Sequence, residues 1–307
     1  MIKKIYFITY HYVRPIKNSK YPNLKGLEYK RFIKQLDLLK KKFHILNHRE
    51  LQNLIKKNSQ KIFKKNQCIL TFDDGYKDNI KYVFPELKKR KISGFFFPTV
   101  NSSGHMKILD VNKIQFLLSK EKFNKKIFEF IFSFLTDIEV QNIKKQKKIF
   151  INKHPYDSKD VSFLKFLLNS YLGKKRKKIL NVLFKKFVTK NHKSFAKNLY
   201  LSKKDIIKLH RNGMYIGCHG TNHVHLAQLE KKDFEKEISN NIKFLKKLNI
   251  FIKDWIMCYP FGSYNKSVIS SLKKKNCFLG LTVNSGFNYL DKLKKFEIKR
   301  IDCNEVE

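Results

Sequence analysis

The sequence lacks the features that would place it outside the ordinary globular proteins. Its 307 residues contain only 11 glycines and 6 prolines, which argues against a low-complexity chain. No run of about 18 apolar residues is present, so the sequence predicts no transmembrane helix. The stretch near the start also lacks the basic, apolar and small-residue order of a secretory signal. We therefore expect a cytoplasmic protein.

Cysteine is scarce and irregularly placed. Small secreted proteins that depend on disulfides have dense and regularly spaced cysteines. Here no Cys-x-x-Cys spacing occurs, and the sequence predicts reduced thiols, as in a cytoplasmic protein. The five cysteines are Cys68, Cys218, Cys258, Cys277 and Cys303.

Acidic residues are also few, with 25 Asp and Glu against 67 Lys and Arg and a formal net charge of +42. Such an excess attracts nucleic acid, acidic glycans or anionic lipid. However, the lysines are spread over the whole chain, and arginine, which forks onto bases and phosphates, is rare. We interpret the charge as a solvated surface and expect no specific nucleic-acid partner.

What is present is a sizeable core and an alternation of strands and helices. Hydrophobic residues make up 42% of the chain, which argues against global disorder. Helical periodicity, as at 231–248, separates the apolar runs, and this alternation is typical of a parallel sheet or barrel. Strands are predicted by β-branched and aromatic runs at 5–10, 67–72, 93–99, 214–218, 255–259 and 279–283.

The middle of the chain has a different texture. From about 107 to 196, helical periodicity is accompanied by many lysines, and one such pattern extends from Leu164 to Phe187. We expect a lysine-rich helical insertion there, without a catalytic role of its own.

The strand predicted at 67–72 leads directly into two neighbouring carboxylates, Asp73 and Asp74, followed by Gly75. In α/β folds, active sites form at the carboxyl ends of parallel strands. The repulsion between the two carboxylates is offset if one binds a cation and the other remains free as a base. The other interpretation is an Asp-Gly turn with both carboxylates solvated.

Two histidines, His219 and His223, stand four residues apart just after another predicted strand. This spacing lets both imidazoles reach one cation. Two His with one Asp suit Zn²⁺ or a similar divalent ion and leave positions open for water and substrate. Alone, such a pair is weak evidence for a metal, and surface or core histidines are its usual explanation. Together with the aspartates, it favours a metal site.

These motifs, in this order, resemble those of the polysaccharide deacetylase family of NodB-homology, carbohydrate esterase type. Thr71–Tyr76 is similar to the first motif, His219–His223 to the second and Tyr259–Gly262 to the third. The resemblance covers roughly residues 5–302 outside the predicted insertion. It implies a single domain over 1–307, with the insertion at about 107–196, built as a distorted (β/α) barrel of about seven strands.

The resemblance also implies roles for single residues. Asp74, His219 and His223 would hold a divalent metal, expected to be Zn²⁺. Asp73 would be the general base that takes a proton from water at the metal. The metal and a backbone N–H near Phe261 would hold the oxyanion. Tyr259 belongs to the same motif and is expected at the substrate.

The chain departs from the family pattern in its third motif. Cys258 stands where an arginine usually orients the base, and we expect Arg300 to replace that arginine. Phe261 stands where a tyrosine is usual, so the backbone donor remains but the hydroxyl is lost.

The usual C-terminal leucine-histidine motif, which supplies the acid, is also absent. Tyr10-His11 is similar to the N-terminal tyrosine-histidine of circularly permuted members. We therefore expect His11 to be the general acid, since small shifts place the pKa of histidine near working pH. The alternative is a histidine held by hydrogen bonds at a strand end.

The expected function is metal-dependent removal of the N-acetyl group from an amino sugar or glycan precursor in surface polysaccharide or lipopolysaccharide metabolism. The alternative is a non-catalytic carbohydrate-binding protein on the same fold. The missing arginine allows that alternative. The retained Asp73, Asp74 and His pair favour the enzyme, because a binding module needs no base beside a metal triad.

Overall fold

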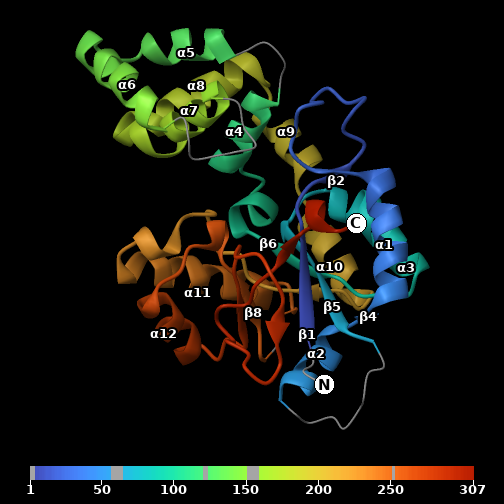
Figure 1. Ribbon diagram of the computed structural model, residues 1–307. Coiled ribbons are helices and arrows are strands. Elements are labelled where there is room, and N and C mark those ends of the chain that lie inside the picture. Colours follow the sequence, from blue (N-terminus) through green and yellow to red (C-terminus); the bar gives the residue numbers. More distant parts are fainter. Residues whose placement is uncertain (1–3, 57–64, 120–123, 151–158, 251–252) are drawn as a thin grey trace. The chain divides into compact units, whose positions relative to one another are not determined.

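The computed structural model describes residues 4–56, 65–119, 124–150, 159–250 and 253–307. Contacts divide the chain into two compact units (Figure 1). The barrel unit comprises residues 1–15, 26–107 and 196–307, and the helical unit comprises residues 16–25 and 108–195. In the described part of the chain, no helix is both long and apolar enough to cross a membrane.

Parallel strands of the barrel unit close into a ring. In order around it they are β1 (Lys4–Tyr10), β5 (Gln67–Asp74), β6 (Phe95–Pro98), β7 (Tyr215–Ile216), β8 (Ile256–Cys258), β9 (Leu279–Leu281) and β11 (Ile301–Asp302). Regular pairing joins most neighbours, and β11 pairs back onto β1. Parallel bridges from Cys218 to Met257 and from Leu281 to Ile298 complete the ring. The predicted distorted seven-stranded barrel is confirmed.

Short strands extend this ring at its margins. β4 is parallel to the start of β5, and β10 is antiparallel to the start of β1. A separate pair joins β2 and β3. Their bounds are β2 (Val13–Arg14), β3 (Leu27–Glu28), β4 (His44–Ile45) and β10 (Asn288–Tyr289).

Alternate strand residues face two different cores. On β5, Leu70 and Phe72 pack in the cluster shared with the surrounding helices, whereas Ile69 packs with Phe97 in the cluster inside the ring. Successive side chains of a strand point to opposite faces, so Asp73 shares the inward face of Ile69. The strand pattern therefore brings this carboxylate to the interior of the barrel at its carboxyl end.

Helices of the barrel unit cover the outside of the ring. α1, for example, buries Phe32, Leu36 and Leu39 and carries its lysines on the exposed side, the spacing expected of an amphipathic helix. The helices are α1 (Tyr29–Lys42), α2 (His48–Ile55), α3 (Phe84–Lys89), α10 (Lys203–Arg211), α11 (Lys231–Lys247) and α12 (Lys266–Lys274).

The helical unit is built from short helices. The single pattern expected from Leu164 to Phe187 is broken, because a π turn at Leu167–Tyr171 and Gly173 at φ +46° separate two helices. Residues 120–123 and 151–158 of the predicted insertion lie outside the described residues, and its status as an insertion stays a prediction. The helices are α4 (Asp110–Leu118), α5 (Asn124–Phe132), α6 (Asp137–Phe150), α7 (Lys159–Phe166), α8 (Arg176–Phe187) and α9 (His192–Leu199), the last of which continues into the barrel unit.

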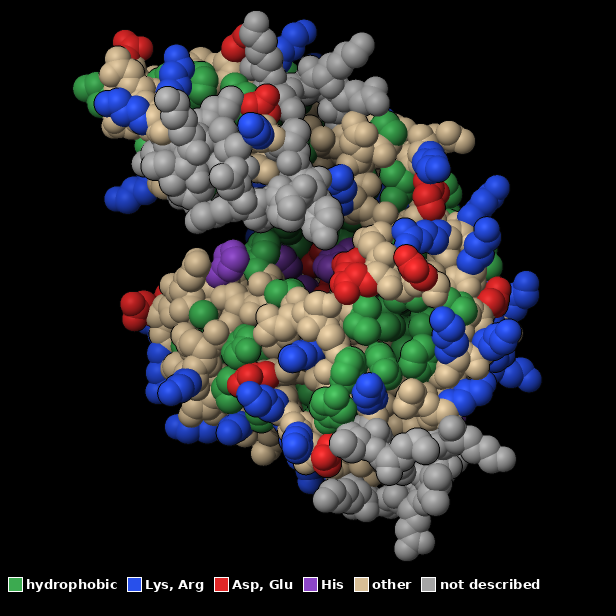
Figure 2. All heavy atoms as spheres, in the orientation of Figure 1, with side chains coloured by type: hydrophobic (Ala, Val, Ile, Leu, Met, Phe, Trp, Pro, Cys, Tyr) green, Lys and Arg blue, Asp and Glu red, His purple; other side chains and the backbone are tan. Residues whose placement is uncertain are grey.

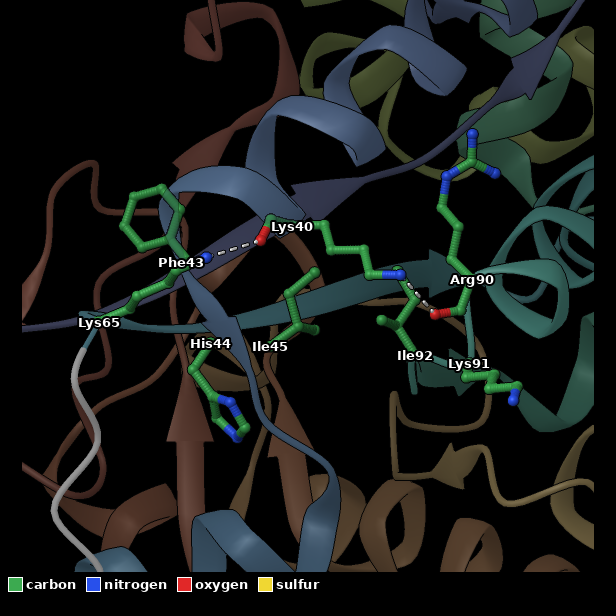
Figure 3. A pocket seen from close by; sticks show the side chains of 8 residues that line it. All are labelled: Lys40, Phe43, His44, Ile45, Lys65, Arg90, Lys91 and Ile92. Atoms are coloured by element: carbon green, nitrogen blue, oxygen red, sulfur yellow. Dashed lines mark hydrogen bonds between the residues drawn. The ribbon is translucent and has the colours of Figure 1, made fainter.

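The amino ends of the barrel strands carry a basic pocket of about 430 Å³ (Figure 3). His44 begins β4, and Lys65 and Ile92 precede β5 and β6. Lys40 reaches across to donate to the backbone oxygen of Arg90 at 3.2 Å. Because these are the amino ends, the pocket lies away from the carboxyl ends that carry the aspartates. It is lined by Lys40, Phe43, His44, Ile45, Lys65, Arg90, Lys91 and Ile92.

Candidate active site

The residues predicted for the site meet at the carboxyl ends of the barrel strands. Histidine side chains gather beside acidic ones on the face shown in Figure 2. Most of these residues lie at or just after the end of a strand, and Arg300 lies next to β11, the strand that closes the ring onto β1. His11 follows β1, Asp73 and Asp74 end β5, His219 and His223 follow the bridge residue Cys218, Tyr259 and Phe261 follow β8, and Arg300 precedes β11.

Asp74 and the two histidines form a buried cluster. The Asp74 Oδ1 atom lies 3.3 Å from His219 Nε2 and 3.2 Å from His223 Nε2. One ligand atom from each side chain lies within 4.8 Å of the others, a separation that a single metal ion can bridge. The structure therefore brings together the three residues predicted to hold the metal.

The donor atoms of this cluster fit a cation. His219 Nδ1 lies 2.8 Å from the carbonyl oxygen of Cys258, so Nδ1 carries a proton and Nε2 is the ring nitrogen that faces Asp74. Burial lowers the pKa of His223 to about 4, which keeps that ring neutral at pH 7. Asp74 Oδ1 has no hydrogen-bond partner among the described residues. Burial disfavours a charge on His219, but its contacts with Cys258 and Asp74 outweigh burial and raise its pKa well above the usual value. Ligand atoms of all three side chains thus converge on one point, and a bound cation would take the place of the proton on His219.

The second oxygen of Asp74 is held separately. The Tyr76 hydroxyl donates to Asp74 Oδ2 at 2.6 Å. Burial, reinforced by Asp74, raises the pKa of Tyr76 well above its usual value, so the hydroxyl keeps its proton. Tyr76 also stacks on Tyr12, with ring centroids 3.9 Å apart. The hydrogen bond from Tyr76 fixes which oxygen of Asp74 faces the histidines. The sequence motif alone did not indicate this role of Tyr76.

Asp73 is held by the arginine that the sequence proposed as a substitute. Arg300 Nη1 donates to Asp73 Oδ1 at 3.0 Å, and Nη2 lies 2.8 Å from Asp73 Oδ2. The guanidinium is itself fixed by the Thr282 carbonyl oxygen and the Thr71 hydroxyl oxygen. Burial raises the pKa of Asp73, but the charge of Arg300 outweighs it, and the pKa falls to about 2. Asp73 is therefore a carboxylate at neutral pH.

Cys258 also contacts this carboxylate. Its Sγ lies 3.3 Å from Asp73 Oδ2, and burial raises the pKa of the thiol, which therefore remains a donor. The sequence suggested only a small buried side chain at this position. A cysteine and a distant arginine together contact Asp73, the predicted base, where the family pattern has one arginine.

His11 lies on the open side of the site. Its Nε2 is 3.9 Å from Asp73 Oδ2, and the side chain is 44% exposed, whereas that of Asp73 is 2% exposed. The structure thus places His11 beside the predicted base, with its side chain exposed to solvent.

The two aromatic residues of the third motif, Tyr259 and Phe261, lie in different surroundings. The Phe261 ring lies 4.4 Å from His223 and stacks on His225 at 4.2 Å, and 39% of the residue is exposed. The Tyr259 hydroxyl instead donates to the Phe296 carbonyl oxygen at 3.2 Å. Phe261 therefore lies with the cluster, while the Tyr259 side chain is not among those brought together.

Backbone conformation at the site is unusual. Asp74, His223 and Phe261 have φ values of 67°, 53° and 56°, in the left-handed region that non-glycine residues seldom adopt. Such conformations persist where surrounding contacts fix them, and they gather at functional sites. Each of the three motifs places one such residue here.

The comparisons with known proteins point to one family. The family model described as polysaccharide deacetylase matches residues 157–278. That match includes His219, His223 and Phe261, and it begins after Asp73 and Asp74. No curated protein matches the chain.

Solved structures share the fold over almost the whole chain. The Streptococcus pyogenes deacetylase PplD in complex with acetate is 17% identical, with a TM-score of 0.61 over 98% of this chain and 93% of its own. IcaB from Ammonifex degensii is 15% identical, with a TM-score of 0.58 over 97% and 91%. A de-N-acetylase from Aggregatibacter actinomycetemcomitans is 13% identical, with a TM-score of 0.58 over 97% and 94%.

The family match carries the sequence relationship, and the solved structures show the same barrel fold. Residues 157–278 are thus similar in sequence to polysaccharide deacetylases, and over almost its whole length the chain shares the barrel fold of solved deacetylases.

Proposed function

We propose that this protein is a metal-dependent deacetylase that hydrolyses the N-acetyl group of an amino sugar or glycan precursor used in surface polysaccharide or lipopolysaccharide metabolism. In this reaction a water oxygen forms a bond to the acetyl carbon and the carbon–nitrogen bond breaks. The products are acetate and a free amine on the sugar.

Asp73 is the base in this proposal. It is ionised and nearly fully buried, and the bidentate contact with Arg300 fixes both oxygens. A fixed carboxylate can accept the proton of the attacking water without prior rearrangement. The same contact with Arg300 lowers its basicity, so its effectiveness depends on position more than on proton affinity.

His11 is the acid. The leaving nitrogen must gain a proton, because an amide anion is a poor leaving group. His11 Nε2 lies 3.9 Å from Asp73 Oδ2, so both groups lie within reach of one acetamide. The histidine on the exposed side gives its proton to the nitrogen while Asp73 on the buried side receives one.

Asp74, His219 and His223 hold the divalent ion, for which Zn²⁺ is our first expectation. When bound, such an ion polarises a carbonyl and makes water a better nucleophile. In this proposal a backbone N–H near Phe261 donates to the developing oxyanion. The exposed Phe261 ring, whose centroid lies 4.4 Å from that of His223, borders the sugar.

One observation carries the proposal: a carboxylate oxygen of Asp74 without a hydrogen-bond partner among the described residues faces the Nε2 atoms of two histidines, and the ionised carboxylate of Asp73 lies next to it. A carbohydrate-binding module would gain nothing from this costly arrangement of buried charge. The single-domain organisation and the cytoplasmic location are further parts of the proposal that rest on the sequence alone.

The test is acetate release by the purified full chain from N-acetylglucosamine and from its short oligomers. We expect release with Zn²⁺ or Co²⁺, loss after dialysis against a chelator, and recovery when metal is returned. Binding of the oligomers without any acetate release, in protein that contains one bound metal ion, would support the non-catalytic alternative instead.

A further inference from the structure

The histidine loop, residues 219–223, is held from behind by one helix. On α11, the buried side chains of Glu237 and Asn241 stand four residues apart and face the same way. Asn241 Oδ1 accepts the backbone N–H of His219 at 2.7 Å. Glu237 and Asn241 thus lie on the buried face of α11, where an amphipathic helix normally carries apolar side chains.

Glu237 makes most of the contacts. Its Oε2 accepts the backbone N–H groups of Thr221 at 2.9 Å and Asn222 at 2.8 Å. Its Oε1 accepts the side-chain amide of Asn222. The Thr221 hydroxyl in turn donates to the backbone oxygen of Glu237 at 2.9 Å. One carboxylate therefore fixes both residues that precede His223.

This arrangement matters because the two histidines are held differently. His219 is oriented through Nδ1 by the Cys258 carbonyl oxygen. His223 Nδ1 has no hydrogen-bond partner among the described residues, and the residue sits at φ +53°. No hydrogen bond at Nδ1 therefore orients this ring, and its position depends more than that of His219 on the backbone leading to it, which Glu237 holds.

We propose that Glu237 and Asn241 are positioning residues that fix the histidine loop for metal binding. This inference rests on the metal site of the proposed function, but neither residue touches the ion or the substrate. Partners outside the ligand set that orient metal ligands typically contribute about 10- to 100-fold to metal affinity. We expect an effect of that size, with the larger share from Glu237.

The experiment compares Glu237→Gln with Glu235→Gln. Both remove one negative charge from α11, but among the described residues Glu235 makes no contact with the histidine loop and accepts a 3.4 Å hydrogen bond from the Ser271 hydroxyl. Glu237→Ala and Asn241→Leu extend the series. Leu183→Ala, which opens a cavity in the helical unit, controls for a loss of stability alone.

Two readouts are needed. In the chelator-treated protein, amide hydrogen exchange at Thr221 and Asn222 should be at least about tenfold faster in the Glu237 variants. In titrations with Zn²⁺ alone, the dissociation constant should rise about 10- to 100-fold for Glu237→Ala. It should rise less for Glu237→Gln, and it should not change for Glu235→Gln or Leu183→Ala.

The outcomes separate this inference from the proposed function. Unchanged exchange in the folded Glu237→Gln protein would overturn the loop contact, and faster exchange with unchanged Zn²⁺ affinity would overturn its role in metal binding. Wild-type protein that binds no Zn²⁺ would overturn the metal site and its positioning together. Wild-type protein that binds Zn²⁺ but releases no acetate would refute the enzyme and leave the positioning role standing.

Discussion

The barrel unit and the helical unit bury different kinds of groups. Among the described residues of the barrel unit, the buried acidic, basic and histidine side chains are Asp73, Asp74, Asp78, His219, Glu237 and Arg300. Among the described residues of the helical unit, Lys113 is the one charged side chain that is buried. Its amine contacts Asp110 and Asn181 at 3.0 and 2.8 Å.

Burial of charge is costly unless the charge is paired, so a fold accumulates such groups only where they serve a purpose or are balanced. In the barrel unit they are balanced through shared contacts, as with Asp73 and Arg300 or Asp78 and Arg14. The helical unit is held mainly by apolar and aromatic packing. Substitutions in the two units should therefore affect different properties.

The largest effect is expected from Asp73→Asn in the barrel unit. The amide cannot accept the proton of water, and kcat should fall by about 10²- to 10⁴-fold. Zn²⁺ affinity should remain near that of the wild type, because the substituted side chain is not a proposed ligand. Arg300 loses its ion-pair partner, so rates are to be compared per folded molecule, with folding followed by circular dichroism. Undiminished kcat in this variant would remove Asp73 from the mechanism.

The converse substitution is Phe184→Ala in the helical unit. The Phe184 ring is fully buried and packs edge-on against Phe195, with centroids 5.3 Å apart. Removal of a buried Phe side chain costs about 3–5 kcal/mol in the free energy of unfolding. Denaturant titration should show this loss, while kcat of the folded protein at low temperature should not change. A large fall in kcat without a loss of stability would contradict the expectation that substitutions in the helical unit affect stability and not activity.

Sequence reasoning works well where the relevant residues are neighbours in the chain. Asp73, Asp74 and the His pair lie directly after apolar runs, and a barrel necessarily gathers strand ends. The structure brings these residues together as expected. Their chemical roles remain predictions.

What sequence reasoning missed depends on contacts between distant segments. Glu237 and Asn241 lie in an amphipathic pattern in which polar residues are normally assigned to solvent, and only the fold shows that they face the histidine loop. Tyr76 was visible in the first motif, but a tyrosine there equally suits a core position. The break at Gly173 was also missed, because the apolar periodicity continues through a residue whose left-handed backbone ends the helix.

A smaller effect concerns the pH dependence of the barrel unit. The His48 ring stacks on Tyr215 at 4.2 Å, and burial lowers its pKa to about 4. The unfolded chain, with a pKa near 6.5, binds the proton more readily than the folded protein does. Stability should therefore be intact above about pH 6.5 and should decline as the pH falls toward 4.

His48→Phe keeps the stack and removes the titration. Its thermal midpoint should change less between pH 7 and pH 4 than that of the wild type. At pH 4 this corresponds to about 1–3 kcal/mol in the free energy of unfolding. Phe184→Ala should lower the midpoint at both pH values without changing the slope. Parallel curves for wild type and His48→Phe would contradict the assignment.

The smallest effect tests whether all contacts of the barrel network count equally. Cys258 and Arg300 both contact Asp73, but a thiol is a weak donor, and the guanidinium carries charge and two hydrogen bonds. Cys258→Ala should therefore lower kcat by less than about tenfold, which corresponds to about 1.4 kcal/mol, and Cys258→Ser should recover most of that loss. Arg300→Met should cost far more, because it leaves a buried carboxylate without its cation. If Cys258→Ala and Arg300→Met reduce kcat to the same degree, the thiol is as important to Asp73 as the arginine. Cys258 would then have a functional role and would not simply fill the volume of the usual arginine.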